Sequence, residues 1–286
     1  MTSTIFRNDL LADKVCIVTG GGTGIGATVA KEFGQLGANV VIASRKQENI
    51  DIAAQGLSRV VGREVTGLTC DIRNRDHVQR LYEQVLEKYG RVDVLVNNGG
   101  GQFFAPAETI TPNGWDAVVA TNLTGTWNMT RAAHDAWMGK HGGCVLNITM
   151  LTRRTFPGMA HSVSARAGVE AMTRTLAIEW ASKRIRLNCI APGIVASSGL
   201  KRYPAGLGVM NQMQQYIPMK RPASCDEVAW MVAYLASEAG AYITGQTLTI
   251  DGGKELWGDW WPIATPKDMP DVEIPPEPWE LPEDEA

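Results

Sequence analysis

Glycines gather in one short stretch, Thr19–Gly26, that directly follows a run of apolar and β-branched residues. The stretch reads Thr-Gly-Gly-Gly-Thr-Gly-Ile-Gly and leads into a segment with helical periodicity. In a strand–turn–helix arrangement, glycines let the backbone take positive φ and approach a pyrophosphate, which then lies against the free N–H groups of the helix. The pattern predicts a dinucleotide-binding turn, the alternative being an ordinary glycine-rich loop.

A second polar cluster, Ser44-Arg45-Lys46, follows the next apolar run, roughly twenty residues further on, where NAD-binding chains carry an acidic residue for the ribose 2′-hydroxyl. No acid is present in the cluster. Arg can grip a 2′-phosphate with two hydrogen bonds and Lys adds a point charge, so the cluster favours NADP(H) over NAD. The alternative is a solvated start of a helix.

The elements that would position these residues recur along the chain as short β-branched runs between helical patterns. The runs are near-continuously apolar, which is typical of parallel strands covered on both faces. Helical spacing is clear in Ile25, Val29, Phe33 and Leu36. We therefore predict an α/β fold with a doubly wound, Rossmann-type parallel sheet of about seven strands in a single domain. The predicted strands are Val15–Thr19, Asn39–Ala43, Val65–Thr69, Val92–Asn97, Val145–Thr149, Arg186–Ile190 and Thr247–Ile250.

The chain divides into an N-terminal extension (1–12), the Rossmann-fold domain (13–253) and a Trp/Pro-rich acidic arm (254–286). Within the domain, residues 197–220 are predicted to form a substrate lid. In the arm, we expect Trp257 to Trp261 to pack on the body or on a neighbouring subunit, and residues past Asp268 to be mobile.

Composition argues against several classes of partner. The 286 residues carry a formal net charge of -3, which gives no basic field for nucleic acid. No apolar run is long enough to cross a bilayer, and residues 1–13 lack the apolar core of a signal peptide. The five cysteines have no metal-site spacing, and no metal is expected. The four that lie in or beside predicted strands, Cys16, Cys70, Cys144 and Cys189, are expected to be small buried apolar residues. We expect a cytoplasmic protein without a membrane or nucleic-acid partner.

The motifs resemble those of the short-chain dehydrogenase/reductase family over about residues 12 to 253. The resemblance rests on the glycine-rich turn, Asp71, Asn97-Asn98-Gly99-Gly100, Asn122 and Pro192-Gly193. It implies that Asp71 meets the adenine, that Asn97 steadies the central strand and that Pro192 to Ser197 border the nicotinamide. It also implies a homotetramer. The expected cofactor-binding residues are Gly20, Thr23, Gly24, Ile25, Gly26, Ser44, Arg45, Lys46, Asp71, Ile72, Asn97, Gly99, Arg166, Pro192, Gly193 and Val195.

The catalytic segment departs from the family pattern of a Ser followed by Tyr-x-x-x-Lys. Arg166 falls at the Lys position, Ser162 at the Tyr position, and Met150 or Thr149 at the Ser position. Reduction of a ketone needs a proton donor of lowered pKa, and neither a serine nor an arginine supplies one. Conjugate reduction of an enoyl thioester instead needs hydrogen-bond donors and a fixed cation to hold an enolate. Ser162, Thr152, Asn122 and Arg166 are the candidate catalytic residues.

Within the family, the chain is most similar to peroxisomal-type trans-2-enoyl-CoA reductases and, slightly less, to 2,4-dienoyl-CoA reductases. The similarity covers Asn97 to Phe103, His141-Gly-Gly143 and Phe156 to Val169. A dienoyl reductase is expected to keep a Tyr near Thr152 and a Lys at position 166, and both are absent here. The last residues, 283–286, are no peroxisomal address. The resemblance implies NADPH-dependent reduction of an enoyl-CoA, in which Ser162, Thr152 and Asn122 polarise the thioester carbonyl and Arg166 fixes the ribose and counters the enolate charge.

Two other functions stay open. A carbonyl or alcohol dehydrogenase could recruit its acid from Tyr203 or Tyr216 in the lid. A catalytically degenerate NADP-binding protein would bind the cofactor and turn nothing over. Smaller features each have two interpretations. His161 is either a proton carrier or a structural residue, and Met210, Met213 and Met219 either form a wall against the acyl chain or fill gaps in the core. Arg153, Arg154, Lys201 and Arg202 are either contacts for the phosphates of coenzyme A or solvated cations.

Overall fold

A seven-stranded parallel sheet forms the centre of the computed structural model, which describes residues 3, 5–202, 214–258, 261–268 and 273–280. The strand order is β3-β2-β1-β4-β5-β6-β9, so the chain runs outward on one side of β1 and then crosses to the other side with β4. The strands are β1 (Val15–Thr19), β2 (Asn39–Ser44), β3 (Val65–Thr69), β4 (Val94–Asn97), β5 (Gly143–Ile148), β6 (Ile185–Pro192) and β9 (Thr247–Ile250). The predicted fold class is confirmed, and each of the seven predicted strands overlaps an observed one.

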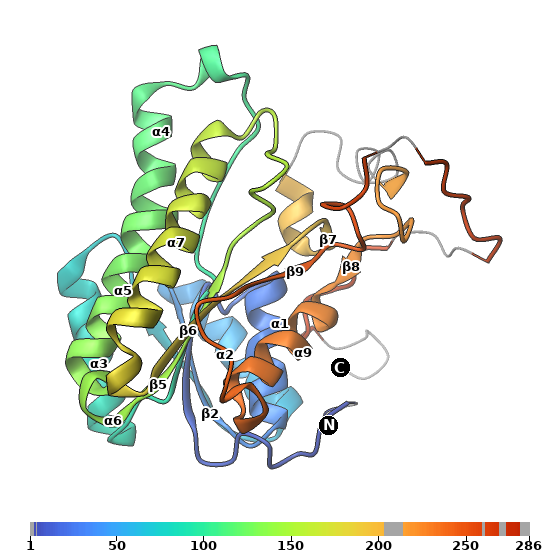
Figure 1. Ribbon diagram of the computed structural model, residues 1–286. Helices are drawn as coiled ribbons and strands as arrows, with labels where there is room; N and C mark the ends of the chain where they lie inside the picture. The colour runs from blue at the N-terminus through green and yellow to red at the C-terminus, as the bar shows by residue number, and fades with distance from the viewer. Residues whose placement is uncertain (1–2, 4, 203–213, 259–260, 269–272, 281–286) are drawn as a thin grey trace.

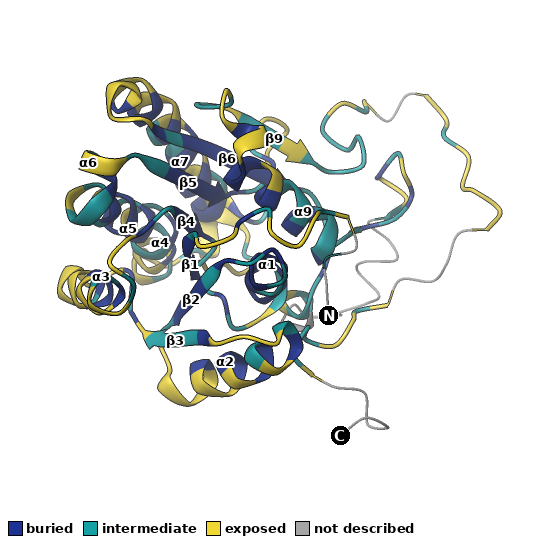
Figure 2. Ribbon diagram, turned by 90° about the horizontal axis from the view of Figure 1, so that it is seen from below, coloured by how far each residue is buried: buried dark blue, intermediate teal, exposed yellow. Residues whose placement is uncertain are grey.

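Helices cover both faces of this sheet, as Figure 2 shows from below. One layer consists of α1 (Gly24–Gln35), α2 (Gln47–Val61) and α9 (Cys225–Ala236). The other contains α3 (Arg75–Tyr89), α5 (Gly125–Ala133) and α7 (Ala160–Glu179). The α5 helix is the middle of a longer run that also includes α4 (Pro112–Val119), the π-helical turns η2 (Ala120–Thr124) and η3 (His134–Met138), and α6 (Gly139–His141). Two layers around one sheet explain the near-continuous apolar runs.

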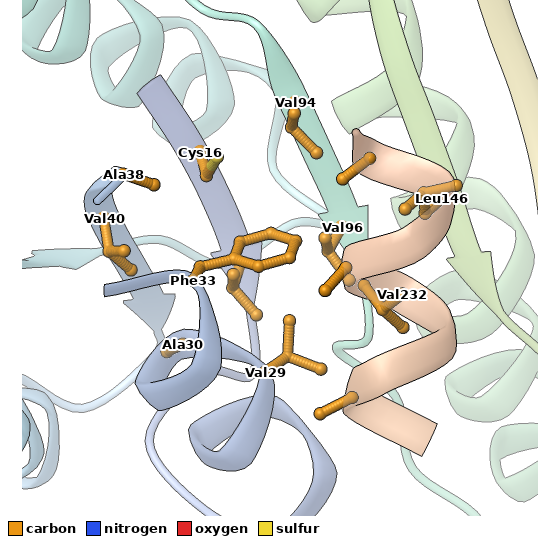
Figure 3. Packing of buried hydrophobic residues seen from close by; sticks show 14 of the residues in the cluster. Cys16, Val29, Ala30, Phe33, Ala38, Val40, Val94, Val96, Leu146 and Val232 are labelled. Atoms are coloured by element: carbon orange, nitrogen blue, oxygen red, sulfur yellow. The ribbon is translucent and has the colours of Figure 1, made fainter. Parts of the chain in front are cut away.

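The apolar residues that recur every 3.6 positions in α1 form one face of the helix, and this face packs on the sheet. Val29 and Phe33 are fully buried and point toward the strands, between α1 and α9 (Figure 3). The sheet supplies Cys16 and Val96 to the same cluster, and α9 supplies Val232. Burial of one such side chain stabilises the fold by about 1.5–3 kcal/mol. The four cysteines predicted to be buried are buried, and so is Cys225 at the start of α9; all five are free.

A small two-stranded sheet lies apart from the main one and was not predicted. It pairs β7 (Val195–Ala196) in parallel with β8 (Ala223–Ser224). The pairing joins the segment after β6 to the start of α9, where Ser224 forms a capping box with Glu227. It therefore fixes the segment after β6 next to the N-terminus of α1.

The described part of the C-terminal arm around residues 261–268 extends away from the domain, and residues 273–280 lie back against it (Figure 1). Contrary to the expectation of mobility beyond Asp268, Trp279 packs against the core cluster beneath α1 and α2. Trp257 lies against Lys220, whose Nζ is 4.8 Å from the indole ring, while Trp261 is exposed. No helix among the described residues is long and apolar enough to cross a membrane.

Candidate active site

The glycine-rich turn lies at the carboxyl ends of β1 and β4, where the strand order reverses. Open α/β sheets bind ligands at this point. Gly20 and Gly24 have φ of +64° and +52°, which only glycine adopts readily. A Cβ on Gly26 would lie 2.2 Å from the Gly20 carbonyl oxygen, so helix and turn touch backbone to backbone. The geometry fits a pyrophosphate cradle.

Asn98 fastens this turn to β4 and was missed as a site residue. Its Nδ2 donates to the carbonyls of Thr19 and Gly20 at 3.1 and 3.2 Å. In return, the Thr19 hydroxyl oxygen accepts the backbone N–H groups of Asn98 and Gly99 at 3.1 and 2.9 Å. The cradle is therefore held from both sides before any ligand arrives.

The predicted adenosine end lies on the ends of β2 and β3. Arg45 and Lys46 are exposed just beyond β2, so their charges are available to a ligand. Asp71 follows β3, and Arg73 holds it with bonds of 2.9 and 2.5 Å. This hydrogen-bonded cation lowers the pKa of the Asp71 carboxyl, with Arg45 adding a smaller effect. Beyond it, the Ile72 side chain comes within 3.5 Å of where a Cβ of Gly99 would be.

Asn97 is buried within the sheet rather than exposed in the cleft. Its Nδ2 donates to Asn147 and Thr130 at 2.8 and 3.0 Å, and Asn147 in turn donates to Thr173 on α7. Asn97 is in register with Thr19 of β1. Through these hydrogen bonds Asn97 ties β4 and β5 to α7.

Ser162 is buried at the first turn of α7 and has two partners. Its hydroxyl donates to Gln102 Oε1 at 2.7 Å and lies 3.6 Å from Met150 Sδ. The adjacent backbone N–H of Ser162 donates to His161 Nδ1 at 2.8 Å. Gln102, which the sequence analysis did not single out as a site residue, thus orients the predicted donor from the loop after β4.

Arg166 lies one turn further along α7 and brings a positive charge into the interior. Its Nη1 donates to the Ile148 carbonyl at 2.8 Å, and a Cβ on Gly100 would lie 2.3 Å from Nη2. Burial lowers the pKa of the guanidinium to about 10, which leaves it protonated at neutral pH. No carboxylate of the described residues forms an ion pair with it. A buried cation without such a partner is costly, so the site is suited to an anionic or strongly polarised ligand.

Asn122 lies in the π-helical turn η2, and π-helical turns are frequent at functional sites. Its amide grips Gly101 from both sides: Oδ1 accepts the Gly101 N–H at 2.9 Å, and Nδ2 donates to the Gly101 carbonyl at 3.0 Å. The amide is thus already paired, which changes its predicted role. Asn122 positions the loop that carries Gln102 rather than presenting a free donor to a substrate carbonyl.

Comparison with known proteins decides the family. A family model described as enoyl-(acyl carrier protein) reductase matches residues 20–255. This chain belongs to the short-chain dehydrogenase/reductase family. It is 37% identical to a peroxisomal 2,4-dienoyl-CoA reductase of Danio rerio, covering 88% of this chain and 85% of that protein. It is 35% identical to a probable 2,4-dienoyl-CoA reductase of Bacillus subtilis (strain 168), covering 85% and 97%. A solved citronellol catabolism dehydrogenase of Pseudomonas aeruginosa PAO1 superposes with a TM-score of 0.79 at 35% identity, covering 88% and 98%.

As a member of the short-chain dehydrogenase/reductase family, the protein is an oxidoreductase that uses a nicotinamide cofactor. The segment that the family resemblance places beside the nicotinamide begins at the end of β6. Gly193 donates to the Ile250 carbonyl at 2.8 Å, and a Cβ on it would lie 2.9 Å from Asp251. Val195 is buried in the small sheet. Pro192 to Ser197 thus run from the sheet edge toward the N-terminus of α1, where the Ser197 side chain lies 3.5 Å from where a Cβ of Gly24 would be.

Thr152 is directed to a partner that the sequence did not reveal. Its hydroxyl donates to both carboxylate oxygens of Glu170, at 3.1 and 3.0 Å, one turn beyond Arg166 on α7. Burial is the largest effect on Glu170 and raises its pKa, while Thr152 and Arg174 oppose the rise. Ser162, Arg166 and Asn122 therefore meet around residues 100–102, whereas the Thr152 hydroxyl is engaged with a buried carboxylate.

The remaining candidates are less well placed in this short-chain dehydrogenase/reductase. Tyr216 is exposed, with Lys254 Nζ 5.3 Å from its ring centre, and Met219 is exposed as well. His161 is buried edge-on to Phe103 with a ring separation of 4.3 Å. Arg153 and Arg154 lie on the surface beside the C-terminal arm, where Arg154 donates to the Trp257 carbonyl. Tyr203, Met210, Met213, Trp260, the middle of the predicted lid (residues 203–213) and the side chains of Lys201 and Arg202 lie outside the described residues.

Proposed function

We propose that this oxidoreductase uses NADPH to reduce the 2,3 double bond of an enoyl thioester carried by coenzyme A. The observation that carries the proposal is the buried Arg166 guanidinium, which stands with Ser162 where the family pattern has Tyr and Lys. A fixed cation and a hydroxyl suit an enolate better than they suit a ketone that must be protonated.

The cofactor fits the residues that are present. The glycines let the turn and α1 approach each other backbone to backbone, α1 presents its N-terminal N–H groups, and Arg45 and Lys46 suit a 2′-phosphate. When bound, the nicotinamide supplies a hydride to the β carbon of the substrate. The electron pair of the C2–C3 double bond then forms a double bond between the α carbon and the carbonyl carbon, and the carbonyl π pair moves onto the thioester oxygen.

The chain's own groups hold the enolate that results. Ser162 can turn its hydroxyl from Gln102 to the developing oxyanion, and Arg166 provides a positive charge in an interior where screening is weak. Asn122 keeps the loop of Gly101 and Gln102 in place opposite α7. Water delivers the proton to the α carbon, so the mechanism needs no side chain of tyrosine-like acidity.

The test is NADPH oxidation with trans-2-enoyl-CoA esters of several chain lengths, beside simple ketones, NADH and a control without substrate. Ser162→Ala should lower kcat with enoyl-CoA by about tenfold while NADPH affinity stays within twofold, because one oxyanion donor is removed outside the cofactor cradle. Ser164→Ala, on the exposed side of α7, is the matched control and should behave as wild type. Unchanged turnover in Ser162→Ala removes the assigned role.

A carbonyl or alcohol dehydrogenase is the second candidate. The Lys254 ammonium beside Tyr216 resembles the cation that acidifies a phenol, which favours this residue as a recruited acid. Ketone turnover that disappears in Tyr216→Phe would establish this function in place of enoyl reduction. NADPH binding without turnover of either substrate class would indicate a protein that has kept the cofactor site alone.

A further inference from the structure

The C-terminal strap (residues 273–280) returns to the glycine-rich turn across 253 residues of sequence. Its Glu277 carboxylate accepts the backbone N–H of Gly24 at 2.7 Å. Gly24 is the first residue of α1, and the Thr23 side chain before it forms no capping hydrogen bond within the described structure. An acidic side chain from the far end of the chain thus caps this helix.

Trp279 anchors the strap on the neighbouring surface. Its Nε1 donates to the Gly22 carbonyl at 3.1 Å, and its indole lies over α2 at Gly56. A Cβ on Gly56 would lie 2.7 Å from Trp279 Cβ, so this contact requires a glycine in the helix. The strap therefore holds the turn through two side chains two residues apart, one charged and one aromatic.

The Glu277 carboxylate lies at the N-terminus of α1, where the pyrophosphate of a dinucleotide would bind. In a strand–turn–helix site the pyrophosphate lies against the N–H groups and positive end of the helix. The Gly24 N–H cannot serve Glu277 and a phosphate at once, and a carboxylate beside a pyrophosphate is repelled. Cofactor binding and this contact are therefore mutually exclusive.

The space around the contact is also restricted. A hollow of about 240 Å³ remains between Gly24, Ser197 and Ser198 on one side and the strap on the other. Small-molecule sites typically measure about 300–1,000 Å³. The strap residues Pro275 to Pro278 form one side of this hollow.

We propose that the C-terminal strap is autoinhibitory: the Glu277 carboxylate competes with the pyrophosphate of the nicotinamide dinucleotide for the N-terminus of α1. The inference rests on the dinucleotide site of the proposed function and is independent of which substrate is reduced. A site that is open only part of the time binds its ligand more weakly by that fraction. Loss of the strap contact should therefore tighten cofactor binding.

The test compares affinity for NADPH and NADH, measured by cofactor fluorescence on the full chain, between wild type, Glu277→Gln and Glu273→Gln. Glu277→Gln keeps a hydrogen-bond acceptor but removes the charge, and it should bind both dinucleotides about three- to tenfold more tightly. Glu273→Gln removes the same charge from an exposed position of the same strap and should bind as wild type. Glu277→Ala and Trp279→Phe should each shift affinity in the same direction as Glu277→Gln.

Hydrogen exchange of the peptide that contains residues 273–280 gives the second readout. Saturating NADPH should increase its exchange, because the strap leaves the turn. Equal affinity in Glu277→Gln and wild type, or decreased exchange with weaker binding in the variant, would overturn the proposal. So would a failure of both dinucleotides to bind Glu277→Ala. Because both dinucleotides carry the pyrophosphate and no substrate is present, a chain that prefers NADH or reduces ketones leaves the test valid.

Discussion

The candidate site has two parts that are built on different principles: the glycine-rich turn with Asn98, here called the cofactor wall, and α7 with Ser162, Arg166 and Glu170, here called the catalytic wall. On the cofactor wall, the glycine turn and Asn98 arrange backbone N–H and carbonyl groups, and the side chains are small or absent. On the catalytic wall, α7 presents Ser162, Arg166 and Glu170 at successive turns, all buried. One wall binds through the main chain, and the other places ionisable side chains in the interior.

This difference explains why one wall follows the family pattern and the other does not. The backbone cradle needs glycine at fixed positions, so a substitution there destroys it. Its sequence motif is therefore easy to recognise. A wall of side chains can change its chemistry by replacing Tyr and Lys with Ser and Arg on the same helix. The comparison therefore separates a backbone turn that follows the family pattern from a helix whose side chains depart from it.

Arg166→Met is the variant expected to have the largest effect, and it tests whether the catalytic wall acts through a buried charge. Loss of the cation should lower kcat with enoyl-CoA by about 10²- to 10³-fold, because charge on the substrate oxygen is no longer countered. The melting temperature should stay the same or rise, since an apolar side chain replaces a buried charge that has no carboxylate partner among the described residues. Steady-state kinetics and thermal melts measure the two effects together.

Arg174→Met is the control, because Arg174 is exposed two turns further along α7. It should leave kcat unchanged and lower the melting temperature by no more than about 1 °C, because its exposed charge only weakly stabilises the Glu170 carboxylate. Retained activity with a lower melting temperature in Arg166→Met would make Arg166 structural and remove the contrast between the walls.

The cofactor wall is tested by Gly26→Ala. The new Cβ would lie 2.2 Å from the Gly20 carbonyl oxygen and 2.4 Å from Asn98 Nδ2, so the turn must open. NADPH affinity should fall by about a hundredfold, equivalent to roughly 3 kcal/mol of lost binding. Titration of cofactor fluorescence measures it.

Gly22→Ala provides the comparison within the same turn, because its Cβ would meet Ala53 at an ordinary 3.5 Å. We expect affinity within about threefold of wild type. Similar losses in both variants would show that the turn tolerates no side chain anywhere and would contradict the specific backbone contact.

The smallest expected effect concerns the buried carboxylate of the catalytic wall. Burial raises the Glu170 pKa, so its contribution to stability is fully present below the pKa of unfolded glutamate and is lost as pH rises through the raised value. Glu170→Gln should therefore melt about 1–3 °C above wild type near pH 7.5, with the gap closing toward about pH 4.5.

Glu179→Gln, exposed at the end of α7, should show no such pH-dependent gap. A lower melting temperature for Glu170→Gln at neutral pH would mean that the ionised carboxylate stabilises Thr152 and its surroundings more than its burial costs.

Much of the fold could be predicted because strands buried on both faces leave an unmistakable apolar run, and three of the seven predicted strands share their bounds with the structure. The glycine turn could also be predicted, because its geometry depends on the local sequence alone. The partners of Asn122, Thr152 and Glu277 were not, since each contact joins segments between 18 and 253 residues apart. No sequence pattern around a polar side chain predicts which distant residue it will contact.

Two π-helical turns, η2 and η3, interrupt the run of helix from Pro112 to His141. Each α-helical residue advances the direction of its side chain by about 100°, so a wider turn resets the phase of everything after it. The helix before η2 and the helix after it, which packs Met129 against Tyr82 of α3, can therefore each turn their own face toward their neighbours. Removal of a single residue from η2 would rotate Asn122 away from Gly101, and would do so while leaving every strand of the sheet in register.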